Sequence, residues 1–113
     1  MRTTVAVIFV SALLFAGVAA GATTTAASGP ESWSDAAFMS ASECAGLAEG
    51  SKLDVAAIKA KLKIADRDRM PYVADRADEL RSDSMRRASH ATGEHRQAID
   101  AKLAGDCQFY LKD

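Results

Sequence analysis

The sequence is poor in the residues and motifs from which active sites are usually built. Its 113 residues include two cysteines and two histidines. None of its serines stands in a Gly-x-Ser-x-Gly or Ser-x-x-Lys motif, and a phosphate-binding Gly-x-x-x-x-Gly-Lys loop is absent. The 15 carboxylates mostly stand beside Lys or Arg, and nothing marks the paired acids of a glycosidase. We therefore predict that the protein is not an enzyme and uses no cofactor, with a small hydrolase as a remote alternative.

The two histidines do not predict a metal site. His90 and His95 are five residues apart, which on a continuous helix separates their side chains by about 140°. Glu94 follows His90 by four residues, but this pair could hold a metal only with further ligands from elsewhere in the chain. We expect both histidines to lie at the surface beside a helix break, with no metal bound.

Low numbers of β-branched residues, the lack of excess positive charge and the lack of asparagine exclude further kinds of fold and partner. After Ser34 only six residues are β-branched, so strands are not expected. The formal net charge of −1 leaves no basic excess of the kind that a nucleic-acid-binding protein needs. Asparagine is absent, so the chain has no acceptor for N-linked glycosylation, which favours a bacterial source.

The N-terminal segment is typical of a secretory signal peptide. Arg2 is the only charged residue before Glu31, and residues 5–20 are apolar or small. A positive start, a short apolar run and a small-residue exit form the signal-peptide pattern. We predict cleavage after Ala22, with Ala20 as the alternative, and a periplasmic or secreted product. The run is a little short of the roughly 20 residues that cross a bilayer, and retention as a membrane anchor stays an alternative.

The predicted organisation is therefore a signal peptide over residues 1–22, a flexible lead-in over 23–32 and a helical domain over 33–113. The lead-in has low hydrophobic content and contains Gly29 and Pro30. Removing Arg2 with the signal changes the formal charge from −1 to −2. We expect no membrane contact after cleavage.

Cys44 and Cys107 predict one structural disulfide. In an oxidising compartment paired cysteines usually join, and neither residue has the close sequence partner of a redox-active motif. For a loop of this length the chain-entropy model gives about 4 kcal/mol of stabilisation. That is a large share of the roughly 5–10 kcal/mol expected for a small domain.

Capping signals and helical periodicity predict four helices. The first starts at the capping box from Ser40 to Glu43, or earlier with Ser34 as the cap. The second opens at Ser51 and the third at Pro71. The fourth opens at Glu94 and continues through Cys107 with an apolar face, weakened at Gly105.

The predicted fold class is all-α: a small antiparallel bundle of three to four helices in which one disulfide joins the first helix to the last. Helical spacing places Val55, Ile58, Leu62 and Ala65 on the core face of the second helix. The core stripes are rich in alanine, which permits close helix approach but buries little area per residue. We expect the disulfide to compensate for this thin core.

Trp33, Phe38 and Met39 form a cluster of large apolar side chains outside the regular stripes. Such a cluster can be an exposed interaction patch, because aromatics and methionine are enriched in interface cores. It can equally be an N-terminal segment that folds back and caps the bundle, with Phe109 and Tyr110 completing the packing. The packing interpretation is the one we favour.

The function predicted from these features is that of an exported, non-enzymatic helical module that binds another protein. The alternative is a periplasmic acid-stress chaperone, because protonation of the many carboxylates would break ion pairs around a thin core. In architecture, an exported helical domain with two cysteines resembles the acid-stress chaperones of the bacterial periplasm. No stretch of the sequence matches their motifs, and Cys107 lies closer to the C-terminus than the second cysteine of those chaperones does.

Overall fold

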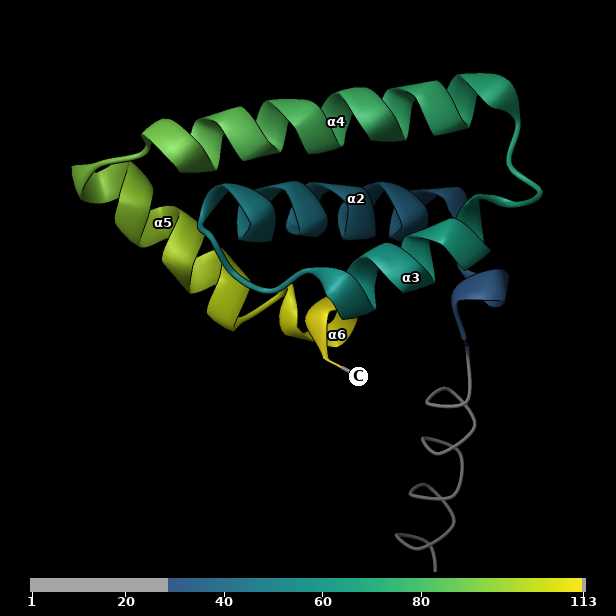
Figure 1. The fold of residues 1–113 in the computed structure, drawn as a ribbon, viewed down its shortest axis with the longest axis horizontal. Helices are drawn as coiled ribbons and strands as arrows, with labels where there is room; N and C mark the ends of the chain where they lie inside the picture. Colours follow the sequence, from purple (N-terminus) through teal and green to yellow (C-terminus); the bar gives the residue numbers. More distant parts are fainter. Residues whose placement is uncertain (1–28, 113) are drawn as a thin grey trace, which may run out of the picture.

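The computed structural model describes residues 29–112, and every regular element in this range is helical (Figure 1). The predicted signal peptide and residues 23–28 of the predicted lead-in lie outside the described residues. Residues 30–32 of that lead-in form a short 3-10 helix that contacts α3. The elements are η1 (Pro30–Ser32), α2 (Asp35–Gly50), α3 (Ala56–Asp66), α4 (Pro71–His90), α5 (Gly93–Ala104) and α6 (Gln108–Leu111).

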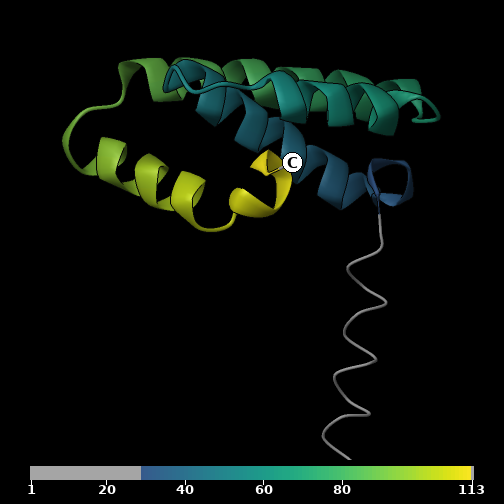
Figure 2. The ribbon, with the colours of Figure 1, turned by 60° about the horizontal axis from the view of Figure 1, so that its bottom comes forward.

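The structure confirms an all-α domain with four main helices, α2 to α5. Helix α2 is central: it contacts α3, α4, α5 and α6, and its contact with α4 is the most extensive in the fold. In Figure 2, α3 and α4 lie above α2, and α5 and α6 lie below it. The helix that carries the first cysteine therefore contacts every other α-helix of the described residues.

Helices α2 and α4 run parallel to each other (Figure 1). Helix α3, which connects them in the sequence, runs in the opposite direction and returns the chain to the end at which α2 starts. Gly46 faces Arg81 and Ser84, and one turn later Gly50 faces Met85 and Ala88. A Cβ at either glycine would lie less than 2.5 Å from a backbone oxygen of α4, closer than real Cβ atoms come. The two helix backbones touch along this line, so the largest helix contact is parallel rather than antiparallel.

The core consists of two clusters joined along α2. One surrounds the disulfide and includes Leu47, Ile58, Ile99 and Leu103. The other lies at the start of α2 and contains Phe38, Ala65, Val73 and Ala77. The expected core face of the second helix is largely right, since Ile58 and Ala65 are buried and Val55 and Leu62 pack against the clusters. Alanine is prominent in both clusters, as predicted.

The predicted start of the first helix at Ser40 is wrong, and the alternative start at Ser34 is right. The Ser34 hydroxyl accepts a hydrogen bond from Ala37 N (3.1 Å), which caps α2. Ser42 is inside the helix, where its hydroxyl donates to Phe38 O (2.9 Å). The capping-box pattern falls on an interior turn here because the preceding residues already form the helix.

The second helix starts later than predicted. Ser51 is the C-cap of α2, and Lys52 adopts a left-handed conformation with φ of 64°. Asp54 then accepts a hydrogen bond from Ala56 N (3.0 Å), where α3 begins. The third helix begins at Pro71 as predicted. No helix within residues 29–112 is both long enough and apolar enough to cross a membrane.

The fourth helix is divided in two, contrary to the continuous helix predicted from Glu94. Helix α5 ends at Ala104, Gly105 leaves the helical conformation, and the Cys107 amide bonds back to Lys102 O (3.0 Å). Cys107 is then the N-cap residue of α6. The apolar face survives the break, because Leu103 and Cys107 are buried and Tyr110 and Leu111 pack against the same cluster.

Candidate functional site

The disulfide is present as predicted and links α2 to the last turn of the chain. Cys44 and Cys107 are both buried, with their Cα atoms 5.5 Å apart and a sequence separation of 63. No free cysteine occurs in the described part of the chain. Because Cys107 directly precedes α6, this four-residue helix is attached covalently to the central helix.

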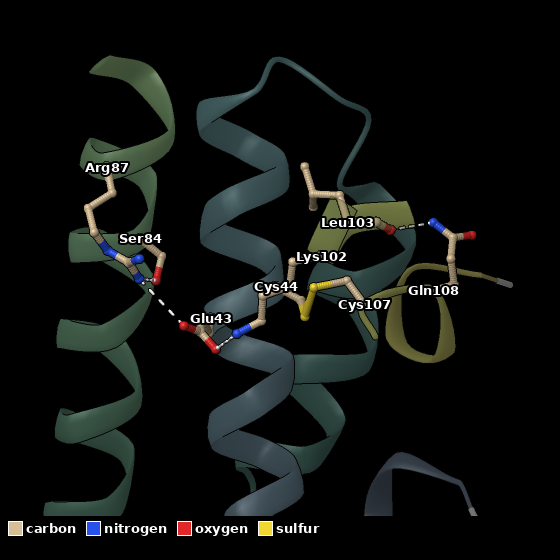
Figure 3. The surroundings of a disulfide bond; sticks show 8 residues. All are labelled: Glu43, Cys44, Ser84, Arg87, Lys102, Leu103, Cys107 and Gln108. Carbon is tan, nitrogen blue, oxygen red and sulfur yellow. Dashed lines mark hydrogen bonds and ion pairs between the residues drawn. A yellow bond between two sulfur atoms is a disulfide. The ribbon is translucent and has the colours of Figure 1, made fainter. Parts of the chain in front are cut away.

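Polar contacts on both sides of the disulfide complete this attachment. Figure 3 shows Glu43, next to Cys44, between Lys102 of α5 and Arg87 of α4; its carboxylate accepts from Lys102 Nζ at 2.8 Å and from Arg87 Nη2 at 3.5 Å. On the other side, Gln108 Nε2 donates to Leu103 O at 2.7 Å, near the end of α5. The disulfide therefore lies inside a hydrogen-bonded frame that joins α2, α4, α5 and α6.

Next to the disulfide lies a group of three aromatic rings in edge-to-face contact, here called the aromatic edge: Trp33, Tyr110 and Phe109. The Trp33 and Tyr110 ring centroids are 5.3 Å apart, and those of Tyr110 and Phe109 are 5.0 Å apart, each pair edge to face. Trp33 and Tyr110 are half-buried, whereas Phe109 is 66% exposed. A large apolar ring is thus held in solvent by an ordered stack.

Lys61 holds the last turn of α6 against α3. Its ammonium donates to Tyr110 O at 3.3 Å and also to Lys112 O. These carbonyls lie at the C-terminal end of α6, where a cation is favourable. The last turn, which carries Phe109 and Tyr110, is consequently fixed by the disulfide, by the Trp33 ring and by Lys61.

The three residues of the predicted patch are distributed between core and surface. Phe38 is 3% exposed and belongs to the second core cluster, and Trp33 and Met39 are half-buried against it. For these three residues the placement agrees with the packing interpretation. Tyr110 also packs against the core as expected, but the expectation that Phe109 completes the packing is wrong, because its ring is 66% exposed. An interaction patch built on these residues stays a prediction, and the large ring that reaches solvent beside it is that of Phe109.

Arg69 fastens the start of α2 to the end of α3. Its guanidinium donates to Trp33 O (2.6 Å), to Asp35 Oδ1 (2.7 Å) and to Ala65 O (2.7 Å), and it lies 4.8 Å from the centre of the Phe38 ring. The side chain is 11% exposed. Sequence reasoning missed this role, since Arg69 stands in a segment of alternating charges that is typical of solvated surface.

The two histidines line one surface pocket, which the sequence did not indicate. The chain turns back at Ala91 and Thr92, so His90 at the end of α4 and His95 in the first turn of α5 border the same cavity. No group of three or more potential metal ligands occurs within residues 29–112. The 140° separation expected from a continuous helix does not apply across this turn.

Comparisons with known proteins provide no relative: no protein-family model, curated protein or solved structure matches the chain. A function for the chain therefore has to be inferred from the chemistry of its own described surface.

Proposed function

We propose that the protein is exported and acts, without catalysis, by binding another protein through the aromatic edge. Export rests on the signal-peptide pattern of residues 1–22, with a periplasmic or secreted product. The observation that carries the binding proposal is the Phe109 ring, exposed on a stack that the Cys44–Cys107 disulfide anchors.

Rigid exposed aromatics are effective binding groups for a physical reason. Burial of a large ring in a partner's pocket is strongly favourable, and aromatic anchors dominate many protein interfaces. The gain is reduced by the entropy lost when mobile side chains and loops become ordered. Here the last turn is already ordered by the disulfide, by the Trp33 ring and by Lys61, so that loss is small.

Affinity capture with exported protein tests the proposal. The wild-type protein is expected to retain a specific partner from a periplasmic extract, and Phe109→Ser to lose it. Tyr72→Ser is the matched control, because Tyr72 is 70% exposed on α4 and belongs to no aromatic stack within the described residues. Equal capture by all three proteins would exclude the aromatic edge as the binding surface.

The ion pairs of α2 support a second candidate function, an acid-stress chaperone. Carboxylates of α2 pair with cations of other elements: Glu43 with Lys102, Glu49 with Arg81, and Asp35 with Arg69. At about pH 2 carboxylates in general are protonated, and the Lys and Arg residues of the domain keep their positive charge without negative partners. The domain would then open and expose its apolar surface.

Circular dichroism and a client-aggregation assay at about pH 2 test this second function. Loss of the near-UV signal together with suppression of client aggregation supports it. An unchanged near-UV spectrum with no suppression would rule the chaperone function out.

A further inference from the structure

A pocket at the turn between α4 and α5 is distinct from the aromatic edge and has the composition of a ligand site. It is here called the turn pocket, and its volume is about 410 Å³. Pockets that hold small molecules usually have a largely apolar lining with a few convergent polar groups, in volumes of roughly 300–1,000 Å³. The turn pocket has both properties.

The apolar part of the turn pocket comes from Ala91, Ala98 and Ile99. Ile99 is buried and belongs to the core cluster around the disulfide, so the floor of the pocket is continuous with the core. Alanines at the other two positions leave room above this floor. A compact apolar group would be accommodated there.

The polar part consists of side chains that can donate hydrogen bonds to an anion. Arg87, His90 and His95 line the pocket, together with the hydroxyl-bearing Thr92, and no carboxylate is among the lining residues. Arg87 pairs with Glu43 through Nη2 and with Asp83 through Nε, both at 3.5 Å, and Nη2 also donates to the Ser84 hydroxyl at 3.0 Å. Nη1 has no hydrogen bond among those of the described residues, and the side chain is 50% exposed. Its guanidinium is therefore able to accept a further anionic partner.

The turn that shapes the pocket is held in place by α5. Arg96 Nη1 donates to Ala88 O at 2.9 Å, near the end of α4, and Nη2 donates to the Ser51 hydroxyl at 2.7 Å. Gly93 has φ of 57°, a conformation that other residues adopt only with strain. These features fix the angle between α4 and α5, so the pocket is formed before any ligand binds.

We propose that the turn pocket binds a small organic anion, a carboxylate with a compact apolar body. The carboxylate would lie against Arg87, His90 and His95, and the apolar body against Ala91, Ala98 and Ile99. The donor groups and the apolar floor together favour this class over free inorganic anions, which would not use the floor.

Titration of the exported protein with benzoate, followed by NMR of the alanine and isoleucine methyl groups, tests the proposal. We expect saturable shifts at the pocket methyls with a dissociation constant of about 1 mM. Benzamide, which has the same shape without the charge, should bind at least about tenfold more weakly, and so should acetate, which lacks the apolar body. Equal binding of benzoate and benzamide, or no saturable shift up to about 10 mM, would overturn the proposal.

Two pairs of variants locate the binding. Arg87→Gln should weaken benzoate binding at least about fivefold, whereas Arg86→Gln removes the same charge from a neighbour outside the pocket and should leave it unchanged. Because Arg87 also contacts Glu43, a second pair avoids the ion pairs. Ala98→Leu fills the pocket and should abolish binding, while Ala101→Leu, exposed on the same helix, should not. Equal effects within either pair would place the benzoate elsewhere and overturn the assignment.

Discussion

Gly46 lies so close to Arg81 that a Cβ atom at Gly46 would be 2.2 Å from the Arg81 carbonyl oxygen. That oxygen belongs to the backbone of α4, so it cannot move away as the end of a flexible side chain could. The absence of a side chain at Gly46 is thus what allows α2 and α4 to pack backbone against backbone. Buried Ser84 and Ala88 opposite Gly46 and Gly50 keep the α4 side of this contact equally small.

We predict that Gly46→Ala destabilises the domain. In an exposed helix this change is usually stabilising by roughly 0.5–1 kcal/mol, because alanine is the better helix former. Here the added methyl group forces the helices apart, and overpacking of this kind usually destabilises by about 1–3 kcal/mol. We expect a melting temperature lower by about 10 °C.

Ser40→Ala, at an exposed position of the same helix, is the control and should change stability by less than about 0.5 kcal/mol. Thermal unfolding followed by far-UV circular dichroism measures both variants. A Gly46→Ala protein as stable as the wild type would mean that the two helices are not in backbone contact.

The helix contact at Gly46 shows where sequence reasoning succeeds and where it ends. Periodicity and capping predicted the helical class, the start of α4 at Pro71 and the Cys44–Cys107 link, because these features depend on local pattern or on there being only two cysteines. The Gly46-x-x-x-Gly50 spacing was also visible in the sequence. The neighbouring residues do not indicate which helix these two glycines would contact, and Gly50 alone resembles an ordinary glycine at the C-terminal end of a helix.

Side chains that act across long separations could not be predicted in the same way. Arg69 contacts Trp33 and Asp35 across separations of 36 and 34 residues, and Lys61 reaches the end of α6. In the sequence, Arg69 and Lys61 each stand among several other charged residues, a pattern that is typical of a solvent-exposed helix face. The pocket shared by His90 and His95 was missed for another reason. The angle between side chains can be calculated from their spacing only within one helix, and the turn at Thr92 separates the two histidines into different helices.

Arg69→Lys tests whether the guanidinium is required where it contacts Trp33, Asp35 and Ala65. A lysine keeps the charge but lacks the planar guanidinium that donates to three acceptors, so we expect at least one of the three hydrogen bonds to be lost. We expect destabilisation by about 1–2 kcal/mol. The emission of Trp33, the single tryptophan, should also change, because its carbonyl is one of the three acceptors.

Arg67→Lys is the matched control, since Arg67 is exposed two residues earlier and has no side-chain hydrogen bond among those of the described residues. Its melting temperature and tryptophan emission should equal those of the wild type. If Arg69→Lys also matched the wild type in both, the contacts of Arg69 would contribute nothing that lysine cannot supply.

Export and cleavage are tested by the mass of the protein recovered outside the cytoplasm. Cleavage after Ala22 predicts a mature chain that begins at Thr23, and cleavage after Ala20 one that begins at Gly21. Replacement of both Ala20 and Ala22 by leucine removes the small side chains that signal peptidase requires and should prevent both products. Full-length wild-type chain in the membrane fraction would instead indicate a retained anchor.

The disulfide should contribute more to stability than any single side chain. Replacing Cys44 and Cys107 by serine opens a loop whose ends have a sequence separation of 63, for which the chain-entropy model gives a loss of about 4 kcal/mol. Urea unfolding of the double variant measures this loss. The wild type in reducing agent should behave similarly, and the double variant should be insensitive to the reductant.

The aromatic edge provides a second readout in the same double variant. Helix α6 has only four residues and is too short to persist alone, so without Cys107 it depends on Lys61, Gln108 and the ring contacts. We expect faster hydrogen exchange at Tyr110 and Leu111 than in α2, and weaker partner capture than by wild type under identical conditions. Unchanged exchange in α6, with the global stability lowered, would mean that the disulfide supports the core and not the aromatic edge. Protein binding through Phe109 would then need a source of rigidity other than the covalent link.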